Sequence, residues 1–261
     1  MYFYPMEIRP LTLENSELAL TAELMQTVYG QKTRLTESYL HWQYVENPLG
    51  PAIGFNAWDG NRLVGHYAII PVELSGKEYK QLWYWSLNTA TRPEYRGKGW
   101  FPSLAKKTYE LAQQKGASGV LGVANRMSYS VFVQKLGFHS LGALSIYLSI
   151  KTTVDNRAYI TRNIQEVWKW RSKNHPWQHQ RSGVYCCLLK GLPLISKIEG
   201  EKTIWGPRLY VALKKPKNKW GFLWPFSWRP SAWEVILLPL KPMEPKFLES
   251  IQVELLDSDA F

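Results

Sequence analysis

A short loop with two glycines and two basic residues is suited to hold a pyrophosphate. The loop lies in the run 92–102 (RPEYRGKGWFP), between an apolar, strand-like segment (82–91) and an amphipathic segment with helical spacing (101–115). Glycines let the backbone approach a ligand closely, and the first N–H groups of a helix lack intrahelical partners and favour negative charge. Arg96 and Lys98 add positive charge at the same place. We therefore predict a phosphate-binding loop rather than a plain strand–helix turn.

A second group of polar residues follows the helix that the loop begins. Gly116 is a natural helix end, and the run 118–124 (SGVLGVA) is typical of a short buried strand. The run 125–128 (NRMS) comes next, then a second helical stretch, and then Leu-Gly-Phe at 136–138. Both polar groups thus sit where an apolar strand gives way to a helix.

These motifs resemble those of the GCN5-related N-acetyltransferase (GNAT) superfamily. The superfamily's loop signature, Arg/Gln-x-x-Gly-x-Gly/Ala, is matched by residues 96–101 except that Phe101 replaces a small residue. The run 125–138 is similar to the superfamily's second motif. The resemblance covers residues 82–138 and is closest to a subgroup reading Tyr-Arg-Gly-Lys-Gly-x-Phe, often linked to bacterial surface-polysaccharide pathways.

The resemblance implies a co-substrate and its contacts. Family members hold acetyl-CoA, or another acyl-CoA, between the fourth and fifth strands of a mixed sheet, and an acceptor amine attacks the thioester directly. Strand four would bind the pantetheine arm through its backbone, the loop would hold the pyrophosphate, and the second motif would add contacts. The residues assigned to the cofactor in this way are Ala90, Thr91, Arg96, Gly97, Lys98, Gly99, Trp100, Phe101, Asn125 and Ser128.

The catalytic groups depart from the family pattern. Many members carry a carboxylate on the fourth strand, where this chain has Asn88, which can orient a water or a substrate but cannot act as a base. Many members also place a tyrosine acid where this chain has Val133, so that Tyr129 is the nearest phenol, unless it serves packing. His66, in an apolar strand, is either a packed core histidine or a group facing the acceptor cleft. The catalytic candidates are Tyr129, Asn88 and His66.

The surrounding elements can be read from periodicity and turn residues. The predicted elements are helices at 11–29 and 36–44, strands at 53–58, 62–74 and 79–91, the loop and its helix, the strand at 118–124, the helix ending at 135, and a strand after 138. This order is also that of the superfamily. We therefore predict an α/β (α+β) GNAT fold with a central mixed, mostly antiparallel sheet. The sheet is expected to be splayed between strands 4 and 5 in the superfamily's numbering, which are 79–91 and 118–124 in this chain.

The second half of the chain has a different character. Residues 1–150 carry a net charge of +3 (14 basic, 11 acidic) and residues 151–261 a net +8 (18 basic, 10 acidic), with eight of the thirteen tryptophans. We predict a GNAT acyl-CoA-binding domain over 1–150, and a basic, Trp-rich region over 151–261, β-rich and packed on the first. Further strands are predicted at 209–213, 233–238 and 251–256. The run 170–176 (WRSKNHP) echoes 42–48 (WQYVENP), which is consistent with a decayed repeat or with chance similarity.

The segment Lys214–Trp233 is the most unusual part of that half. Its basic and aromatic residues suit an exposed loop that contacts an anionic glycan or a peripheral membrane surface, or else a hairpin whose tryptophans fill a core. Nucleic acid is not an expected partner, and the oligomeric state is undetermined. The ending, residues 255–261, is similar to the subgroup's C-terminus, which suggests a complete chain.

Other protein classes lack sequence support. There is no run of eighteen apolar residues and no signal-peptide pattern, and the only two cysteines are adjacent, so we expect a reduced, cytoplasmic protein. The five histidines show no metal-ligand spacing, so we expect no metal.

These observations lead to one function and one rival. We expect an acyl-CoA-dependent N-acyltransferase that passes acetyl from acetyl-CoA to a primary amine, first of all an amino sugar of a surface-glycan precursor. The rival is a non-catalytic module of the same fold, whose basic aromatic half binds an anionic polymer or a membrane surface. A ternary site lined by Asn88, His66 or Tyr129 would favour the enzyme, and a groove plugged by Trp100 and Phe101 would favour the module.

Overall fold

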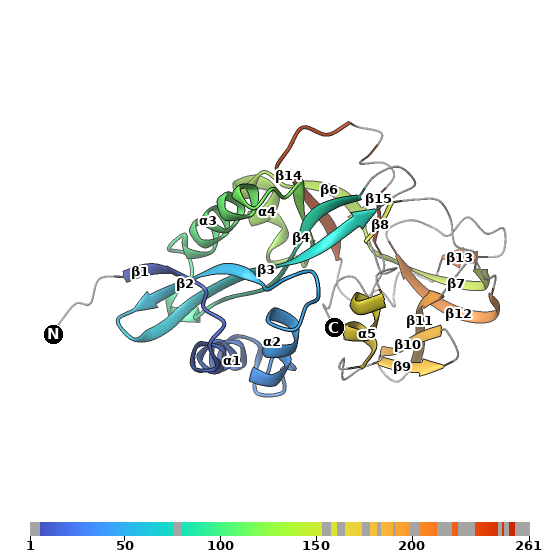
Figure 1. Cartoon of the computed structure of the whole chain (residues 1–261), viewed down its shortest axis with the longest axis horizontal. Helices are drawn as coiled ribbons and strands as arrows, with labels where there is room; N and C mark the ends of the chain where they lie inside the picture. The colour runs from blue at the N-terminus through green and yellow to red at the C-terminus, as the bar shows by residue number, and fades with distance from the viewer. Residues whose placement is uncertain are drawn as a thin grey trace.

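The computed structural model of the protein is built around two β-sheets (Figure 1). The larger, which we call the first sheet, has helices on both faces, and the smaller, the second sheet, lies beside it. The structure describes residues 6–75, 80–152, 158–160, 165–173, 178–181, 184–189, 192–198, 204–212, 221–223, 233–244, 247 and 251–253. Within these residues, no helix combines the length and the apolar character needed to cross a membrane.

The N-terminal elements are two helices and a meander of antiparallel strands. They are β1 (Met6–Pro10), α1 (Asn15–Tyr29), α2 (Glu37–Tyr44), β2 (Ile53–Asp59), β3 (Arg62–Ser75) and β4 (Lys80–Thr91). Thr36 caps α2 as predicted, since its hydroxyl accepts from the backbone N–H of Tyr39 at 3.3 Å. Strand β1 was not predicted: it is short and mostly exposed, so it carries little apolar pattern, and it is held by pairing with β2.

The elements of the two motifs come next. They are α3 (Trp100–Gln114), β5 (Gly119–Ala124), α4 (Tyr129–Leu136) and β6 (His139–Ala143). Helices α3 and α4 lie on one face of the first sheet, and α1 and α2 lie on the other (Figure 1). The predicted order of elements and the predicted α/β fold are therefore confirmed.

The first sheet takes one of its strands from the far end of the chain. Its order is β1-β2-β3-β4-β5-β14-β6, where β14 is Glu234–Pro239. Only β4 and β5 are parallel in this order; β14 is antiparallel to both β5 and β6. The division into 1–150 and 151–261 stays a prediction, but the first sheet draws a strand from beyond that boundary.

The second sheet is built from the residues after β6. Its order is β13-β7-β12-β11-β10-β9, with β11 and β12 parallel and the other pairs antiparallel. The strands are β7 (Ser145–Thr152), β9 (Gln178–Arg181), β10 (Val184–Leu189), β11 (Leu192–Ile198), β12 (Ile204–Ala212) and β13 (Gly221–Leu223). Between β7 and β9 lie β8 (Ala158–Ile160), which pairs with β3 and with β15 (Ile251–Gln252), and α5 (Gln165–Lys173). The β-rich second half is thus confirmed.

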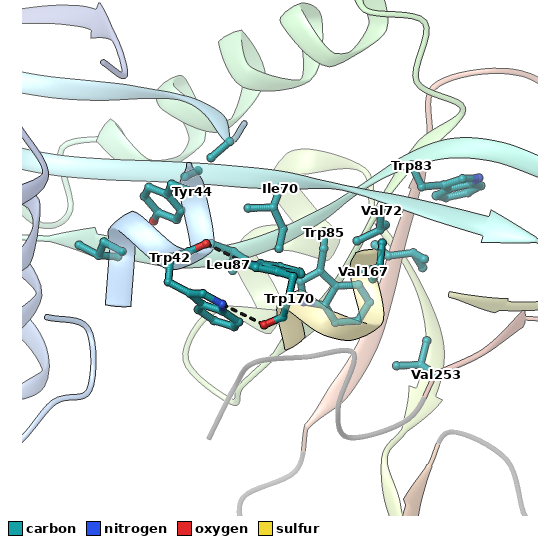
Figure 2. Close-up of a cluster of buried hydrophobic side chains, with 14 of the residues drawn as sticks. Trp42, Tyr44, Ile70, Val72, Trp83, Trp85, Leu87, Val167, Trp170 and Val253 are labelled. Atoms are coloured by element: carbon teal, nitrogen blue, oxygen red, sulfur yellow. Dashed lines mark hydrogen bonds between the residues drawn. The ribbon is translucent and has the colours of Figure 1, made fainter. Parts of the chain in front are cut away.

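Helix α5 joins the second half to the core on the α2 face of the first sheet. Trp42 of α2 and Trp170 of α5 stack with ring centroids 4.8 Å apart (Figure 2). Each indole N–H donates to the other residue's backbone carbonyl, at 3.2 Å from Trp42 and 3.0 Å from Trp170. These two tryptophans head the two echoing runs of the sequence, so the two runs contact each other in the fold. The cluster around them extends to Trp83, Trp85, Val167, Val235 and Val253.

Candidate active site

The two central strands of the first sheet separate halfway along their length. Strands β4 and β5 pair from Tyr84 with Val120 to Ser86 with Gly122, and no pairing between them follows in the described residues. At that last pair a side chain on Gly122 would meet the Ser86 Cβ at 3.1 Å, so the glycine lets the strands stay close up to the point of separation. The predicted splay between strands four and five is therefore present, and residues 87–91 are not paired with β5, although the Thr89 and Thr91 carbonyls accept from side chains.

A β-bulge lies beside this splay. In the β3–β4 register, Ala68 faces Leu87 but His66 faces Ala90, so that two residues of β4, Asn88 and Thr89, oppose one of β3. Asn88 has a φ of 51°, a left-handed conformation that asparagine tolerates better than most residues. The bulge turns the backbone at the point where β4 leaves β5, and residues 88 and 89 are both partly exposed there.

The predicted phosphate loop continues directly from this end of β4. A 3₁₀ turn (Pro93–Tyr95) is followed by Gly97 and Gly99, with φ of 76° and 79°, and Gly99 is the N-cap of α3. The backbone N–H groups from 97 to 101 have no backbone acceptor among the described residues. The loop is exposed, and it presents free N–H groups at the start of a fifteen-residue helix, as an anion site requires.

The two basic residues of the loop are held at its rim. The Arg96 Nε donates to the backbone carbonyl of Thr91 at 3.2 Å, and the Lys98 Nζ lies 5.1 Å from the centre of the Tyr95 ring. Both side chains belong to exposed residues, so their charges face solvent beside the free N–H groups. They are placed to add attraction for a phosphate without being buried by the fold.

Arg92, at the start of the same run, has a different part. It is 6% exposed, and its guanidinium donates to the Leu63 carbonyl at 2.9 Å and to the Glu23 carboxylate at 2.8 Å. These bonds tie the end of β4 to α1 and β3. Arg92 therefore anchors the loop and is not available to a phosphate, a distinction that the basic pattern of the sequence did not make.

The bulky Phe101 of the loop signature packs inward. Its ring lies 5.6 Å from that of Tyr67 on β3 and 5.1 Å from that of Phe132 on α4. Trp100 is half-buried against the same cluster, and its indole N–H is buried without a partner among the described residues. The aromatic cluster under α3 and α4 thus takes up the side chain at the position where the family pattern has a small residue.

The second motif forms a tight turn after β5. The side-chain oxygen of Asn125 accepts from the backbone N–H groups of Met127 and Ser128, both at 3.0 Å, and from the Ser128 hydroxyl at 3.2 Å. Asn125 thereby shapes the entry into α4. Tyr129, the first residue of α4, is half-buried, and its hydroxyl has no hydrogen-bond partner among the described residues.

On the opposite face of the sheet, the bulge contacts α1 and α2. The Asn88 Nδ2 donates to the Gln43 Oε1 at 2.6 Å and to the Tyr44 hydroxyl at 3.0 Å, while the Tyr29 hydroxyl donates to the Thr89 carbonyl. Sequence reasoning missed these three helix residues. The sequence offered little sign of them, apart from the polar residues Gln43 and Tyr44 at the end of the predicted helix 36–44.

His66 is fully buried behind this group. Its Nε2 lies 2.9 Å from the Tyr44 hydroxyl and its Nδ1 lies 2.7 Å from the Asn56 Oδ1. Burial lowers the pKa of His66 to about 3, and burial raises the pKa of the Tyr44 hydroxyl, although the hydrogen bond from Asn88 acts in the opposite sense. Of the catalytic candidates, the structure brings Asn88 and His66 into one network through Tyr44, and Tyr129 lies outside it.

The comparisons with known proteins agree with this geometry. A model of the acetyltransferase (GNAT) domain matches residues 7–140, about half of the chain. The chain therefore belongs to the GNAT acetyltransferase family, and acyl transfer of the N-acetyltransferase type is its class of reaction. No curated protein sequence gives a match.

Solved structures share the fold over nearly the whole chain. A GNAT protein from Kribbella flavida matches with a TM-score of 0.58 and 10% identity, over 90% of this chain and 72% of its own. One from Anabaena variabilis gives 0.55 and 10%, over 90% and 73%. A proposed acetyltransferase from Pyrococcus horikoshii gives 0.56 and 11%, over 92% of both chains. The likeness thus extends beyond the residues that the family model matches, into the second half.

Proposed function

We propose that the protein transfers an acyl group, first of all acetyl, from acyl-CoA to a primary amine held in the same complex. The acceptor class that we favour is an amino sugar of a surface-glycan precursor. The observation that carries the proposal is the continuity of the splayed β4 edge with the glycine loop. This edge offers backbone groups for an amide-bearing arm, and it leads without interruption to free N–H groups at a helix start, which suit a pyrophosphate.

The reaction needs an uncharged amine, a polarised carbonyl and a proton for the thiolate. A nitrogen–carbon bond forms as the lone pair attacks the thioester, the carbon–sulfur bond breaks, and its electron pair leaves with sulfur. The amine nitrogen gives up one proton and the thiolate takes one. On this proposal, backbone N–H groups near the bulge, at 88–89, polarise the carbonyl.

The three candidate side chains divide between direct and indirect parts. Asn88 is partly exposed at the bulge and can contact the acceptor. Tyr129, half-buried at the start of α4 on the β5 side of the splay, is the candidate donor of the proton to sulfur. His66 is fully buried and both its ring nitrogens are engaged, which favours a positioning part over direct contact with substrate.

Cofactor binding is the first test. Calorimetry with acetyl-CoA should give micromolar binding, on the order of −8 kcal/mol, and Arg96→Ala/Lys98→Ala should weaken it at least about tenfold. The matched control is Lys106→Ala/Lys107→Ala, which removes two exposed positive charges from the body of α3 and should leave affinity unchanged. Absence of binding to the parent protein would refute the proposal.

Acceptor choice is the second test. Release of the free CoA thiol should be measured against a panel of amines led by amino sugars, with the matching neutral sugars as controls. Tight acetyl-CoA binding with no thiol release from any amine would favour the non-catalytic module. Its proposed polymer or membrane contact, Lys214–Trp233, lies outside the described residues except at 221–223 and 233.

We also propose that the second half is a decayed copy of the first. Strands β9, β10, β11, β12, β7 and β13 follow the order and directions of β2, β3, β4, β5, β14 and β6. On this proposal the last strand of each half joins the sheet of the other half: β7 lies in the second sheet and β14 in the first. Helices α2 and α5 occupy equivalent places before β2 and β9. On this proposal the protein has a single cofactor site, because only five residues, 199–203, separate β11 from β12.

A further inference from the structure

A buried row of hydrogen bonds connects the bulge of β4 with the N-terminus of α1. From the bulge, the contacts are Asn88 Nδ2 to the Tyr44 hydroxyl (3.0 Å), Tyr44 to the His66 Nε2 (2.9 Å) and the His66 Nδ1 to the Asn56 Oδ1 (2.7 Å). The row ends where the Asn56 Nδ2 donates to the Glu17 Oε1 at 2.7 Å. The three central residues are completely buried, so they exchange no hydrogen bonds with solvent.

The end at Glu17, together with the neutral state of the His66 ring, fixes the direction of every bond in the row. The Glu17 carboxylate only accepts, and it also receives the Thr12 backbone N–H and hydroxyl. The amide nitrogen of Asn56 must therefore face Glu17, so the Asn56 carbonyl faces His66 and accepts from its Nδ1–H. Because the buried ring is neutral, the His66 Nε2 is an acceptor and the Tyr44 hydroxyl donates to it.

This direction determines which end of the Asn88 amide is free. The Tyr44 hydroxyl uses its own hydrogen in the bond to His66, so its oxygen accepts from the Asn88 Nδ2. The Gln43 Oε1 accepts the second Nδ2 hydrogen at 2.6 Å. Both amide hydrogens of Asn88 are then used. The Asn88 Oδ1 has no hydrogen-bond partner among the described residues, and Asn88 is partly exposed at the splay.

We propose that Tyr44, with Gln43, is a positioning residue that fixes the Asn88 amide so that its Oδ1 accepts an N–H from the acceptor amine. The inference rests on the proposed function. A neutral oxygen that accepts one N–H orients the amine lone pair toward the thioester but does not remove a proton. Asn56 interrupts the row as a proton path, because a carboxamide does not pass protons on, so the row sets orientation only. Asn88 is on this account an orienting group and not a base.

Kinetics of Tyr44→Phe test the positioning role. We expect kcat to fall by between about tenfold and a hundredfold, with KM for acetyl-CoA unchanged. The matched control is Tyr109→Phe, which removes another buried tyrosine hydroxyl, one bonded to Tyr67 at 2.7 Å on the opposite face of the sheet, and should leave kcat unchanged. In the Asn88→Ala background, Tyr44→Phe should have no further effect on kcat, since it acts through Asn88. Additive losses, or an equal loss in Tyr109→Phe, would overturn the proposal.

A second measurement does not depend on activity. Nitrogen-15 spectra of histidine-labelled protein should show His66 as the neutral Nδ1–H tautomer, unchanged between pH 5 and 9, with the resonance assigned by its loss in His66→Gln. An Nε2–H tautomer would overturn the direction of the row, whatever the kinetics show. The reverse result, the expected tautomer with no acyl transfer to any amine, would refute the proposed function and with it the role assigned to Asn88.

Discussion

The first and second sheets repeat one arrangement of strands but differ in what joins the two parallel strands at their centre. In the first sheet, β4 and β5 are joined by residues 92–118, which carry the glycine loop and all of α3. In the second sheet, the equivalent strands β11 and β12 are joined by residues 199–203, which are too few for a helix of that length. Both sheets contain a parallel pair, and in the first sheet the connection places free N–H groups beside that pair.

The comparison separates the scaffold from the site. Both sheets have a central parallel pair, and the five residues that connect this pair in the second sheet are too few for a glycine loop followed by a helix as long as α3. The row of polar residues behind the bulge includes His66 of β3, whereas β10, the counterpart of β3 in the proposed repeat, reads Val-Tyr-Cys-Cys-Leu-Leu and carries no histidine. On the proposed function, the chemistry depends on the glycine loop and on a few polar residues of the first sheet, and not on the strand order that the two sheets share.

The largest expected effect comes from breaking the exchange of strands between the halves. A fragment of residues 1–150 lacks β14, whose Val235, Ile236 and Leu237 are fully buried between β5 and β6. Burial of three such side chains stabilises by about 5 to 9 kcal/mol, comparable with the whole stability of a domain. We expect the fragment to show no cooperative unfolding transition by circular dichroism and no acetyl-CoA binding. A peptide of residues 233–240 should restore part of both, and a fragment that folds and binds alone would show the first half to be independent.

The next effect comes from breaking the tryptophan contact between the halves. Trp42→Ala and Trp170→Ala should each lower the free energy of unfolding by about 3 to 5 kcal/mol, measured by urea denaturation. Because the two rings share one stack and two reciprocal hydrogen bonds, the double variant should lose clearly less than the sum. The control is Trp58→Ala, because Trp58 is buried in a separate cluster. The losses in free energy of unfolding from Trp58→Ala and Trp42→Ala should be additive. Equal additivity in the two pairs would mean that the stack is not a coupled unit.

A smaller effect is the pH dependence of stability that His66 gives to β3 and that β10, which has no histidine, does not share. Burial lowers the pKa of His66 to about 3 from an unfolded value near 6.5, so the unfolded chain binds a proton that the folded chain excludes. This contribution to stability is fully present above pH 6.5 and is lost as the pH falls toward 3. Between pH 6.5 and 5 it amounts to about 2 kcal/mol. Urea unfolding should show that the free energy of unfolding falls by about 2 kcal/mol less in His66→Gln than in the parent protein between pH 6.5 and 5. An equal fall in both proteins would mean that His66 is not excluded from protonation.

Much of the first sheet could be predicted from sequence because its signals are local. Turn residues at 59–61, the capping Thr36 and the glycines at 97 and 99 each fix the backbone where they stand, and the structure places them as expected. The strand predicted at 233–238 is also present as β14, but the sequence did not predict that it would pair with β5 and β6. An apolar run predicts a strand without naming the sheet that receives it, because pairing partners distant in sequence leave no local trace.

The polar row behind the bulge could not be predicted for a related reason. It joins Glu17, Asn56, His66, Tyr44 and Asn88, which come from α1, β2, β3, α2 and β4 and have no common spacing. Each residue alone has an ordinary explanation as a surface or packing group. Only the register of β2 with β3, and the position of α2 over the bulge, place their polar atoms within hydrogen-bond distance.

The smallest effect tests whether the loop alone makes the cofactor site of the first sheet. Gly99 and Gly116 have similar left-handed conformations, with φ of 79° and 83°, and a Cβ at either position would point into open space, so alanine strains both alike. Gly99 is the N-cap of α3 beside the free N–H groups, whereas Gly116 follows the other end of that helix. Calorimetry should therefore show acetyl-CoA affinity about tenfold weaker in Gly99→Ala and unchanged in Gly116→Ala, although both lower stability similarly. The binding stoichiometry should be one per chain in each case. Two molecules bound per chain, or equal losses of affinity in the two variants, would show that the site is not confined to the loop between β4 and β5.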